Sequence, residues 1–201
     1  MERYNLAIIT KKIYASNFSL FTLKTLRDIL EIKTESTLFS IIKKLRQANI
    51  IEKIERNKYL LAGTRIHDFA LANFLYRPSY VSFESALNFY GILSQFPYEI
   101  SSATGKKPIK QSNQNKIFVY THIKNDLFWG YEKKEDFIIA WPEKALLDQI
   151  YLASKGYKKI NLDEYDLSKI NHLKLKKYLS KYPKTRQFTS AAQKFKKYIH
   201  L

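Results

Sequence analysis

The chain has 201 residues, and its 35 lysines and arginines against 18 aspartates and glutamates give a formal net charge of +17. Its hydrophobic content of 45% argues against a disordered protein, and the absence of cysteine excludes disulfides and thiolate metal sites. No apolar run approaches the ~20 residues that cross a membrane, and no signal peptide is recognisable, so we expect a cytoplasmic protein without a membrane partner. A charge of this size attracts nucleic acid, although a lysine-rich composition also follows from an A/T-rich genome.

The first sixty residues predict three helices and a hairpin. The stretches "NLAIITKKIYASN", "TLKTLRDILEI" and "STLFSIIKKLRQAN" repeat apolar residues at helical spacing, and Thr22 is a suitable N-cap for the second helix. In the third, the apolar stripe consists of Leu38, Ile41, Ile42 and Leu45. The segment "IIEKIERNKYLLA" then predicts a hairpin, because Asn57 tolerates the positive φ that its tip requires.

Two helices joined by about four residues and followed by a hairpin indicate a winged helix-turn-helix. Hydroxyl and amide groups bind base edges or phosphates, and lysines add attraction to the DNA backbone. The candidate DNA-binding residues are therefore Ser36, Thr37, Ser40, Lys43, Lys44 and Gln47 on the third helix, with Arg56 and Lys58 at the tip of the hairpin. The alternative is a protein-docking module on which these lysines are only solvated.

The second half alternates helical and β-type stretches. Pro78 ends a helix in "RIHDFALANFLY", and Ser82 and Gly91 are suited to begin and close one in "YVSFESALNFYGIL". Four stretches predict strands, of which the last two form a hairpin: "YEISSAT", "KIFVYTHI", "LFWGYE" and "DFIIAW". The segment "GKKPIKQSNQNK" between the first two predicts a mobile basic loop.

The stretch "IAWPEKALLD" combines a glutamate, a lysine and an aspartate behind a Trp-Pro pair. Pro142 suits the first position of a helix, and Glu143 suits its first turn. Lys144 and Asp148 are four residues apart and would share a face, where an exposed pair contributes only ~0.2–0.5 kcal/mol. A strand-to-helix junction is therefore favoured over a catalytic cluster, because a nucleophile, a base and an orienting group are not all present.

Basic residues dominate two parts of the second half. No acidic residue lies between Glu99 and Asp126 or after Asp166, and the tail predicts two basic amphipathic helices with Leu173, Leu175, Tyr178 and Leu179 packed inward. Solvated lysine faces are the plain alternative to an anion-binding surface. The candidate phosphate-binding residues are Lys106, Lys107, Lys110, Lys144, Arg186, Lys194 and Lys197. We expect no catalytic residue, cofactor or metal, since His67, His122, His172 and His200 have no metal-ligand spacing.

The blocks "FALANFLYRPSYVSFESALNFYGI" and "IAWPEKALLDQIYL", with the hairpin ending "NKYLLAG", resemble the AbiEi family of antitoxins from type IV toxin–antitoxin pairs. The resemblance covers roughly residues 18–182. At the hairpin tip the family tends to have glycine, where this chain has Asn57. Asparagine is the next most tolerant residue for positive φ, so the turn is expected to survive.

The resemblance implies a transcriptional repressor that binds inverted repeats in its own promoter through the N-terminal domain. It implies that the C-terminal domain counters a nucleotidyltransferase toxin without a stable complex, as part of abortive infection and phage defence. We hypothesise that the basic second half meets the RNA or nucleotide that the toxin attacks. Two alternatives stay open: a stand-alone transcriptional regulator, and an RNA-binding protein that shields the toxin's substrate.

The predicted fold is α+β with two domains. Residues 1–62 form the winged helix-turn-helix, and residues 63–201 form a mixed helical domain with a small antiparallel sheet and a basic helical tail.

Overall fold

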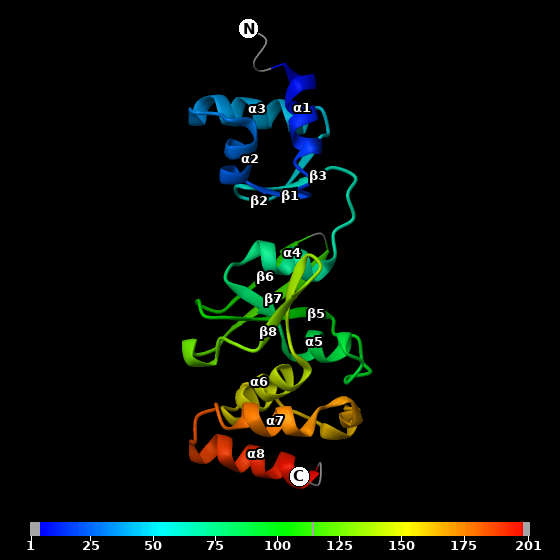
Figure 1. Cartoon of the computed structure of the whole chain (residues 1–201), viewed down its shortest axis with the longest axis vertical. Coiled ribbons are helices and arrows are strands. Elements are labelled where there is room, and N and C mark those ends of the chain that lie inside the picture. The colour runs from blue at the N-terminus through cyan, green and yellow to red at the C-terminus, as the bar shows by residue number, and fades with distance from the viewer. Residues whose placement is uncertain (1–4, 114, 199–201) are drawn as a thin grey trace. The chain divides into compact units, whose positions relative to one another are not determined.

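A computed structural model of the protein describes residues 5–113 and 115–198 (Figure 1). The described residues form eight α-helices and two β-sheets, which confirms a mixed α+β fold. They fall into two compact units, unit 1 from Met1 to Ile66 and unit 2 from His67 to Leu201. Within the described ranges, no helix combines the length and apolar character needed to cross a membrane.

Unit 1 contains three helices and a three-stranded sheet. The elements are α1 (Leu6–Ala15), β1 (Leu20–Thr22), α2 (Leu23–Leu30), α3 (Glu35–Gln47), β2 (Ile51–Glu55) and β3 (Lys58–Leu61). The sheet is antiparallel with the order β1-β3-β2. The hydroxyl of Thr22 accepts a hydrogen bond from the Thr25 N–H, so the predicted N-cap of α2 is confirmed. The short strand β1 was not predicted.

One hydrophobic core holds unit 1 together. The four apolar residues predicted for α3 are all buried, and they pack with Ile13 of α1, Phe21 of β1 and Leu26 of α2. Each such side chain contributes roughly 1.5–3 kcal/mol when it is fully buried. The core therefore fixes which face of α3 points inward and leaves the opposite face exposed.

Unit 2 is built around a six-stranded sheet. Its elements are α4 (Asp68–Leu75), β4 (Ser79–Val81), α5 (Phe83–Phe89), β5 (Glu99–Thr104), β6 (Ile109–Asn113), β7 (Lys116–His122), β8 (Tyr131–Lys134), β9 (Phe137–Ala140), α6 (Pro142–Ser154), α7 (His172–Leu179) and α8 (Arg186–Tyr198), with short 3-10 turns at Asn125–Leu127, Leu162–Glu164 and Leu167–Lys169. The prediction of helices in the tail is confirmed for the described residues, whereas His200 and residue 114 lie outside them.

The prediction of a small antiparallel sheet is wrong. The strand order is β6-β7-β5-β4-β9-β8, and two of the pairings, β5 with β7 and β4 with β9, are parallel. The mobile loop expected after Gly105 is also wrong, because Ile109–Asn113 forms β6 and pairs with β7. The strand was not recognisable from the sequence because it is rich in lysine and amide side chains. As an edge strand it has little buried surface and shows no alternation of apolar and polar residues.

Two further expectations about unit 2 are corrected. The stretch "LFWGYE" does not form one strand, because Leu127 ends a 3-10 turn and Gly130 has φ +78°, so β8 begins only at Tyr131. Leu173 was expected to pack inward, but its side chain is 82% exposed, whereas Leu175 and Tyr178 of the same helix are buried. A helix of eight residues has room for only a narrow buried stripe.

Helices cover both faces of the sheet in unit 2. On one face, the Tyr120 hydroxyl of β7 donates to the Ala72 carbonyl of α4 at 2.7 Å. On the other, the Tyr80 hydroxyl of β4 donates to Asp148 of α6 at 3.1 Å. Helix α6 contacts α5, α7 and α8, and Figure 1 shows α6, α7 and α8 at the far end of the unit from α4. Helix α6 is consequently an interior element of unit 2.

Candidate functional site

Helix α3 presents a polar face opposite its buried stripe. Successive residues of a helix turn by about 100°, so Ser36, Ser40, Lys43 and Gln47 fall within one narrow sector. All four side chains are exposed. Helices that read DNA present such a row of hydroxyl, amide and cationic groups to the major groove.

Two pairs of residues flank this central row. On one side lie Lys44, which is exposed, and Thr37, which is half-buried and accepts a hydrogen bond from the Thr34 hydroxyl at 2.7 Å. On the other side lie Phe39 and Arg46, which the sequence prediction did not include. Phe39 is 47% exposed although it is large and apolar, so this face carries an unburied aromatic ring beside its cations.

The charges on this part of α3 are mostly uncompensated. Among the described residues, neither Lys43 nor Lys44 has a carboxylate within ion-pair distance. Glu35, at the first position of the helix, is neutralised by Arg27 of α2 at 3.1 Å. Lys43 and Lys44 are consequently available to an external anion.

The hairpin tip supplies further cations. Asn57 has φ +62° at the turn, and its carbonyl accepts a hydrogen bond from the Leu23 N–H at 3.2 Å, which fixes the tip to the start of α2. Arg56 is exposed. Lys58 pairs with Glu55 at 2.7 Å, so its charge is partly compensated and Arg56 is the stronger candidate at the tip.

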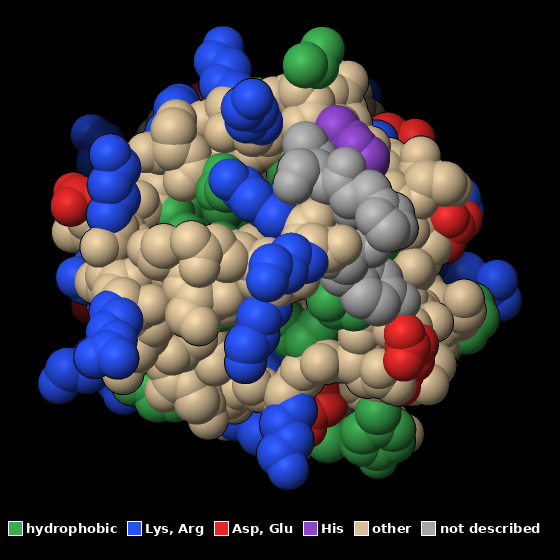
Figure 2. Space-filling view, turned by 90° about the horizontal axis from the view of Figure 1, so that it is seen from below, with side chains coloured by type: hydrophobic (Ala, Val, Ile, Leu, Met, Phe, Trp, Pro, Cys, Tyr) green, Lys and Arg blue, Asp and Glu red, His purple; other side chains and the backbone are tan. Residues whose placement is uncertain are grey.

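The candidate phosphate-binding residues of unit 2 do not form one cluster. Lys106 and Lys107 follow β5, Lys110 lies on β6 and pairs with Glu99, and Arg186, Lys194 and Lys197 belong to α8. Figure 2 looks at the end of unit 2 that carries α8 and shows Lys and Arg side chains scattered over this face. Basic charge is therefore spread widely here, without one obvious centre.

Lys144 is not a surface residue. Lys144 and Asp148 are both completely buried on α6, where they form an ion pair. Asp148 also accepts hydrogen bonds from the hydroxyls of Tyr182 at 2.8 Å, Ser82 at 3.0 Å and Tyr80 at 3.1 Å. The proposed phosphate contact at Lys144 is therefore wrong for this structure, because its ammonium group already has a buried carboxylate partner.

Burial controls the titration of this cluster. Desolvation lowers the pKa of Lys144, although the negative charge of Asp148 acts in the opposite direction. Desolvation also raises the pKa of Tyr80 and of Tyr182 well above the ordinary tyrosine value, and Asp148 reinforces both shifts. The Lys144 ammonium lies 5.1 Å from the centre of the Trp129 ring, so cation–π attraction supplements the ion pair.

The buried cluster joins the two sequence blocks that carry the family resemblance. Tyr80 and Ser82 belong to "YVSFESAL", and Lys144 and Asp148 belong to "PEKALLD". A parallel β-bridge between Val81 and Ile139 brings the two blocks together in the sheet. The charged and hydroxyl side chains of these blocks therefore lie in the interior of unit 2.

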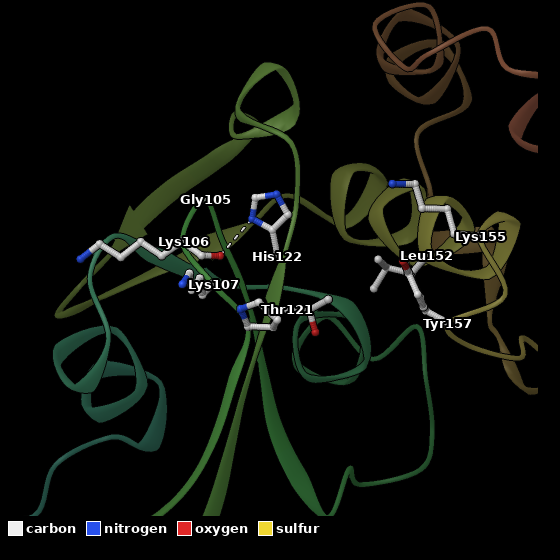
Figure 3. A pocket seen from close by; sticks show the side chains of 9 residues that line it. Gly105, Lys106, Lys107, Thr121, His122, Leu152, Lys155 and Tyr157 are labelled. Carbon is white, nitrogen blue, oxygen red and sulfur yellow. Dashed lines mark hydrogen bonds between the residues drawn. The ribbon is translucent and has the colours of Figure 1, made fainter.

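A wide opening in unit 2 lies at the ends of β5 and β7. It is bordered by Gly105, Lys106, Lys107, Pro108, Thr121, His122, Leu152, Lys155 and Tyr157, and it has a volume of about 710 Å³. Figure 3 shows Leu152, Lys155 and Tyr157 on one side and His122 and Thr121 on the other. The sequence prediction included Lys106 and Lys107 but missed Lys155 and Tyr157, which lie in a different part of the chain.

A scan against protein-family models and a search of curated proteins give no match for this chain. No group of three or more His, Asp or Glu side chains within residues 5–113 and 115–198 is placed to hold a metal ion. The features that bear on function are therefore the exposed face of α3, the tip of the hairpin and the resemblance of the sequence blocks.

Proposed function

We propose that the protein is a DNA-binding antitoxin that represses its own operon. Unit 1 acts as a winged helix-turn-helix: α3 enters the major groove, and the β2–β3 hairpin is the wing that contacts the flanking backbone. Unit 2 supplies the antitoxin activity against a nucleotidyltransferase toxin.

The exposed row on α3 is the single observation that carries the DNA-binding proposal. Ser36 and Ser40 lie in the first half of α3, and Lys43 follows one turn later on the same face. Hydroxyl groups bond base edges or phosphates, and a lysine without a carboxylate partner neutralises a phosphate and releases counterions. Arg56 at the tip of the hairpin adds a cation suited to a phosphate or a minor groove.

The antitoxin part of the proposal has a different support. It comes from the resemblance of the two sequence blocks, which contact each other through Asp148. Because the residues shared by these two blocks are buried, the resemblance concerns the fold of unit 2. A similar fold does not by itself establish a similar function. A genetic test of antitoxicity is therefore needed beside the DNA-binding test.

The DNA-binding experiment changes Lys43→Ala together with Lys44→Ala. We expect weaker binding to the promoter fragment upstream of the protein's own gene. The slope of log K against log salt should fall by about two units, since each phosphate contact contributes about 0.9. Fluorescence anisotropy at several salt concentrations measures both quantities on the full-length protein.

A matched control removes the same charge elsewhere. Lys133→Ala with Lys176→Ala changes two exposed lysines of unit 2 that have no ion pair among the described residues. This control should keep the wild-type slope. An unchanged slope in the α3 variant, or an equal change in the control, would contradict docking through α3.

The antitoxicity test uses the same full-length α3 variant. Cells that express the neighbouring nucleotidyltransferase gene should be rescued by the variant as well as by the wild type, because the antitoxin activity is assigned to unit 2. Loss of rescue together with loss of DNA binding would assign both activities to unit 1. Absence of rescue by the wild-type protein would leave a stand-alone transcriptional regulator as the function.

A further inference from the structure

The opening at the ends of β5 and β7 has the position of a ligand site. The two strands are parallel, with Thr104 of β5 opposite His122 of β7, so their carboxyl ends lie at the same edge of the sheet. Ligands of open α/β sheets commonly bind beyond the carboxyl ends of parallel strands. The volume of about 710 Å³ lies within the usual range for small-molecule pockets.

Several contacts hold the Gly105–Pro108 loop at the rim. The Lys106 carbonyl accepts a hydrogen bond from His122 Nδ1 at 2.9 Å, and the Lys107 carbonyl accepts one from the Tyr76 hydroxyl at 3.0 Å. A Cβ at Gly105 would come within 2.9 Å of the Asn125 side-chain oxygen, so the Asn125 side chain lies close against this turn. The rim is consequently a built structure with defined anchors.

The lining is basic and contains no carboxylate. Lys107 and Lys155 are exposed and have no ion pair among the described residues, whereas Lys110 and Lys116 of the same sheet are paired with Glu99 and Asp68. The Lys106 ammonium lies over the Tyr76 ring, and Figure 3 shows its side chain directed away from Lys155. The Lys155 ammonium lies 4.4 Å from the centre of the Tyr151 ring. Neither Lys155 nor Lys107 has a carboxylate partner among the described residues, so both charges are uncompensated.

An exposed aromatic ring completes the lining. Tyr157 is 72% exposed, and it lies beside Leu152 on the side of the opening opposite Thr121 and His122 (Figure 3). An exposed aromatic ring next to uncompensated lysines matches a ligand that has both an anionic group and a planar ring. Base stacking on an aromatic side chain and phosphate binding by lysine are the two parts of nucleotide recognition.

We propose that this opening binds a nucleotide, with its phosphates at Lys107 and Lys155 and its base against Tyr157. The ligand is either a free nucleoside triphosphate or the terminal nucleotide of an RNA strand, since both present the same chemistry. This inference does not depend on the DNA-binding function, because all of its residues belong to unit 2.

The test titrates the full-length protein with GTP, with ATP and with inorganic triphosphate in isothermal titration calorimetry. Lys107→Ala with Lys155→Ala should weaken the binding of all three by about tenfold or more. Tyr157→Ala should weaken GTP and ATP by about fivefold, the low end of what stacking contributes, and leave triphosphate unchanged. Tyr157→Phe should bind like the wild type, because it keeps the ring.

Lys133→Ala with Lys176→Ala is the control for charge, and it should leave every affinity unchanged. Competition between GTP and a short single-stranded RNA separates the two sources of the nucleotide. RNA that displaces GTP at lower concentration identifies a strand terminus, and RNA that fails to displace it identifies a free nucleotide. Circular RNA of the same length should not compete.

Three results would overturn the proposal. The first is no binding of any nucleotide or RNA by the wild type. The second is an equal loss in Lys107→Ala with Lys155→Ala and in the charge control. The third is displacement of GTP by a polyglutamate peptide at the concentration at which RNA works, which would indicate a general anion surface. Lys43→Ala with Lys44→Ala should retain nucleotide binding, so failure here and failure of the DNA-binding proposal are separate results.

Discussion

Helices α3 and α6 have the same length, 13 residues, and each contains lysine, yet the fold uses them in opposite ways. Helix α3 buries one stripe and leaves Lys43 and Lys44 in solvent. Helix α6 is enclosed by neighbouring elements, and Lys144 and Asp148 are completely buried in it. The difference between the two helices is where the partners of the charged groups lie.

The charged groups of α6 have partners supplied by distant parts of the chain. Tyr80, Ser82 and Tyr182 each donate to Asp148 from positions 34 to 68 residues away. On α3, neither Lys43 nor Lys44 has a carboxylate within ion-pair distance among the described residues. A buried charge needs such partners, whereas an exposed charge is satisfied by water or by an external ligand. The charges of Lys144 and Asp148 are therefore part of the folded interior, whereas those of Lys43 and Lys44 are free to bind a ligand.

The largest expected effect tests the buried side of this comparison. Asp148→Ala should lower the free energy of unfolding by about 3–5 kcal/mol, because it leaves the Lys144 ammonium buried without its counterion. Urea unfolding followed by tryptophan fluorescence measures it, and both tryptophans, Trp129 and Trp141, belong to unit 2.

The control for this variant is the residue that follows the same helix. Lys155→Ala removes an exposed lysine just after α6, and it should change the free energy of unfolding by less than about 0.5 kcal/mol. Asp148→Asn should be intermediate, since an amide still accepts hydrogen bonds but carries no charge. A loss below about 1 kcal/mol for Asp148→Ala would mean that the pair is not essential to the interior of unit 2.

Local features of the fold were predictable because they depend on neighbouring residues. Thr22 caps α2, Asn57 takes positive φ at the turn, and Pro142 begins α6, each as expected from residue type. Ser82 was placed correctly at the start of α5, but its hydroxyl donates to Asp148 and makes no cap hydrogen bond to the helix. Its position followed from local sequence, and its role followed from a contact 66 residues away.

Features that depend on distant partners were not predictable. The strands β1 and β4 have three residues each, too few for a periodic pattern, and they exist because longer strands pair with them. For the candidate site, the polar residues of α3 follow from helical spacing, whereas Phe39 was missed because an apolar residue is normally expected inside. Tyr157 was missed because its place in the opening depends on packing across unit 2.

The ionisation of Tyr182 at alkaline pH gives a second test of the buried cluster, because it makes the stability of unit 2 depend on pH. Because the folded pKa of Tyr182 is raised, the folded state keeps a proton that the unfolded state loses near pH 10. This stabilisation is fully present below pH 10 and is lost as the pH rises toward the folded pKa, at about 1.4 kcal/mol per pH unit. Because the unfolded tyrosine is only half ionised at pH 10, Tyr182→Phe should make the fall in stability between pH 10 and 11 shallower by about 1 kcal/mol.

The measurement is urea unfolding at pH 9, 10 and 11. Tyr157→Phe is the matched control, because Tyr157 is largely exposed and should leave the slope unchanged. Burial also raises the pKa of Tyr165 to about 12, so the wild-type slope has other contributors and only the difference between variants reports on Tyr182. Equal slopes for Tyr182→Phe and the wild type would contradict a protonated, buried Tyr182 hydroxyl at this pH.

The smallest expected effect tests the exposed side of the comparison. Arg46 lies on the flank of the α3 row, and its positive charge opposes the rise that burial causes in the pKa of Tyr59 on β3. Arg46→Ala should weaken promoter binding by about fivefold, which corresponds to about 1 kcal/mol, and reduce the salt slope by about 0.9 if it contacts one phosphate. Arg46→Lys should restore the slope, because the charge returns, whereas a contact that needs the planar guanidinium would stay lost. A full rescue by lysine assigns Arg46 to the DNA backbone, and a partial rescue assigns it to a base edge. If neither variant has an effect, the DNA contact is confined to the hairpin tip and to the central row of α3, which consists of Ser36, Ser40, Lys43 and Gln47.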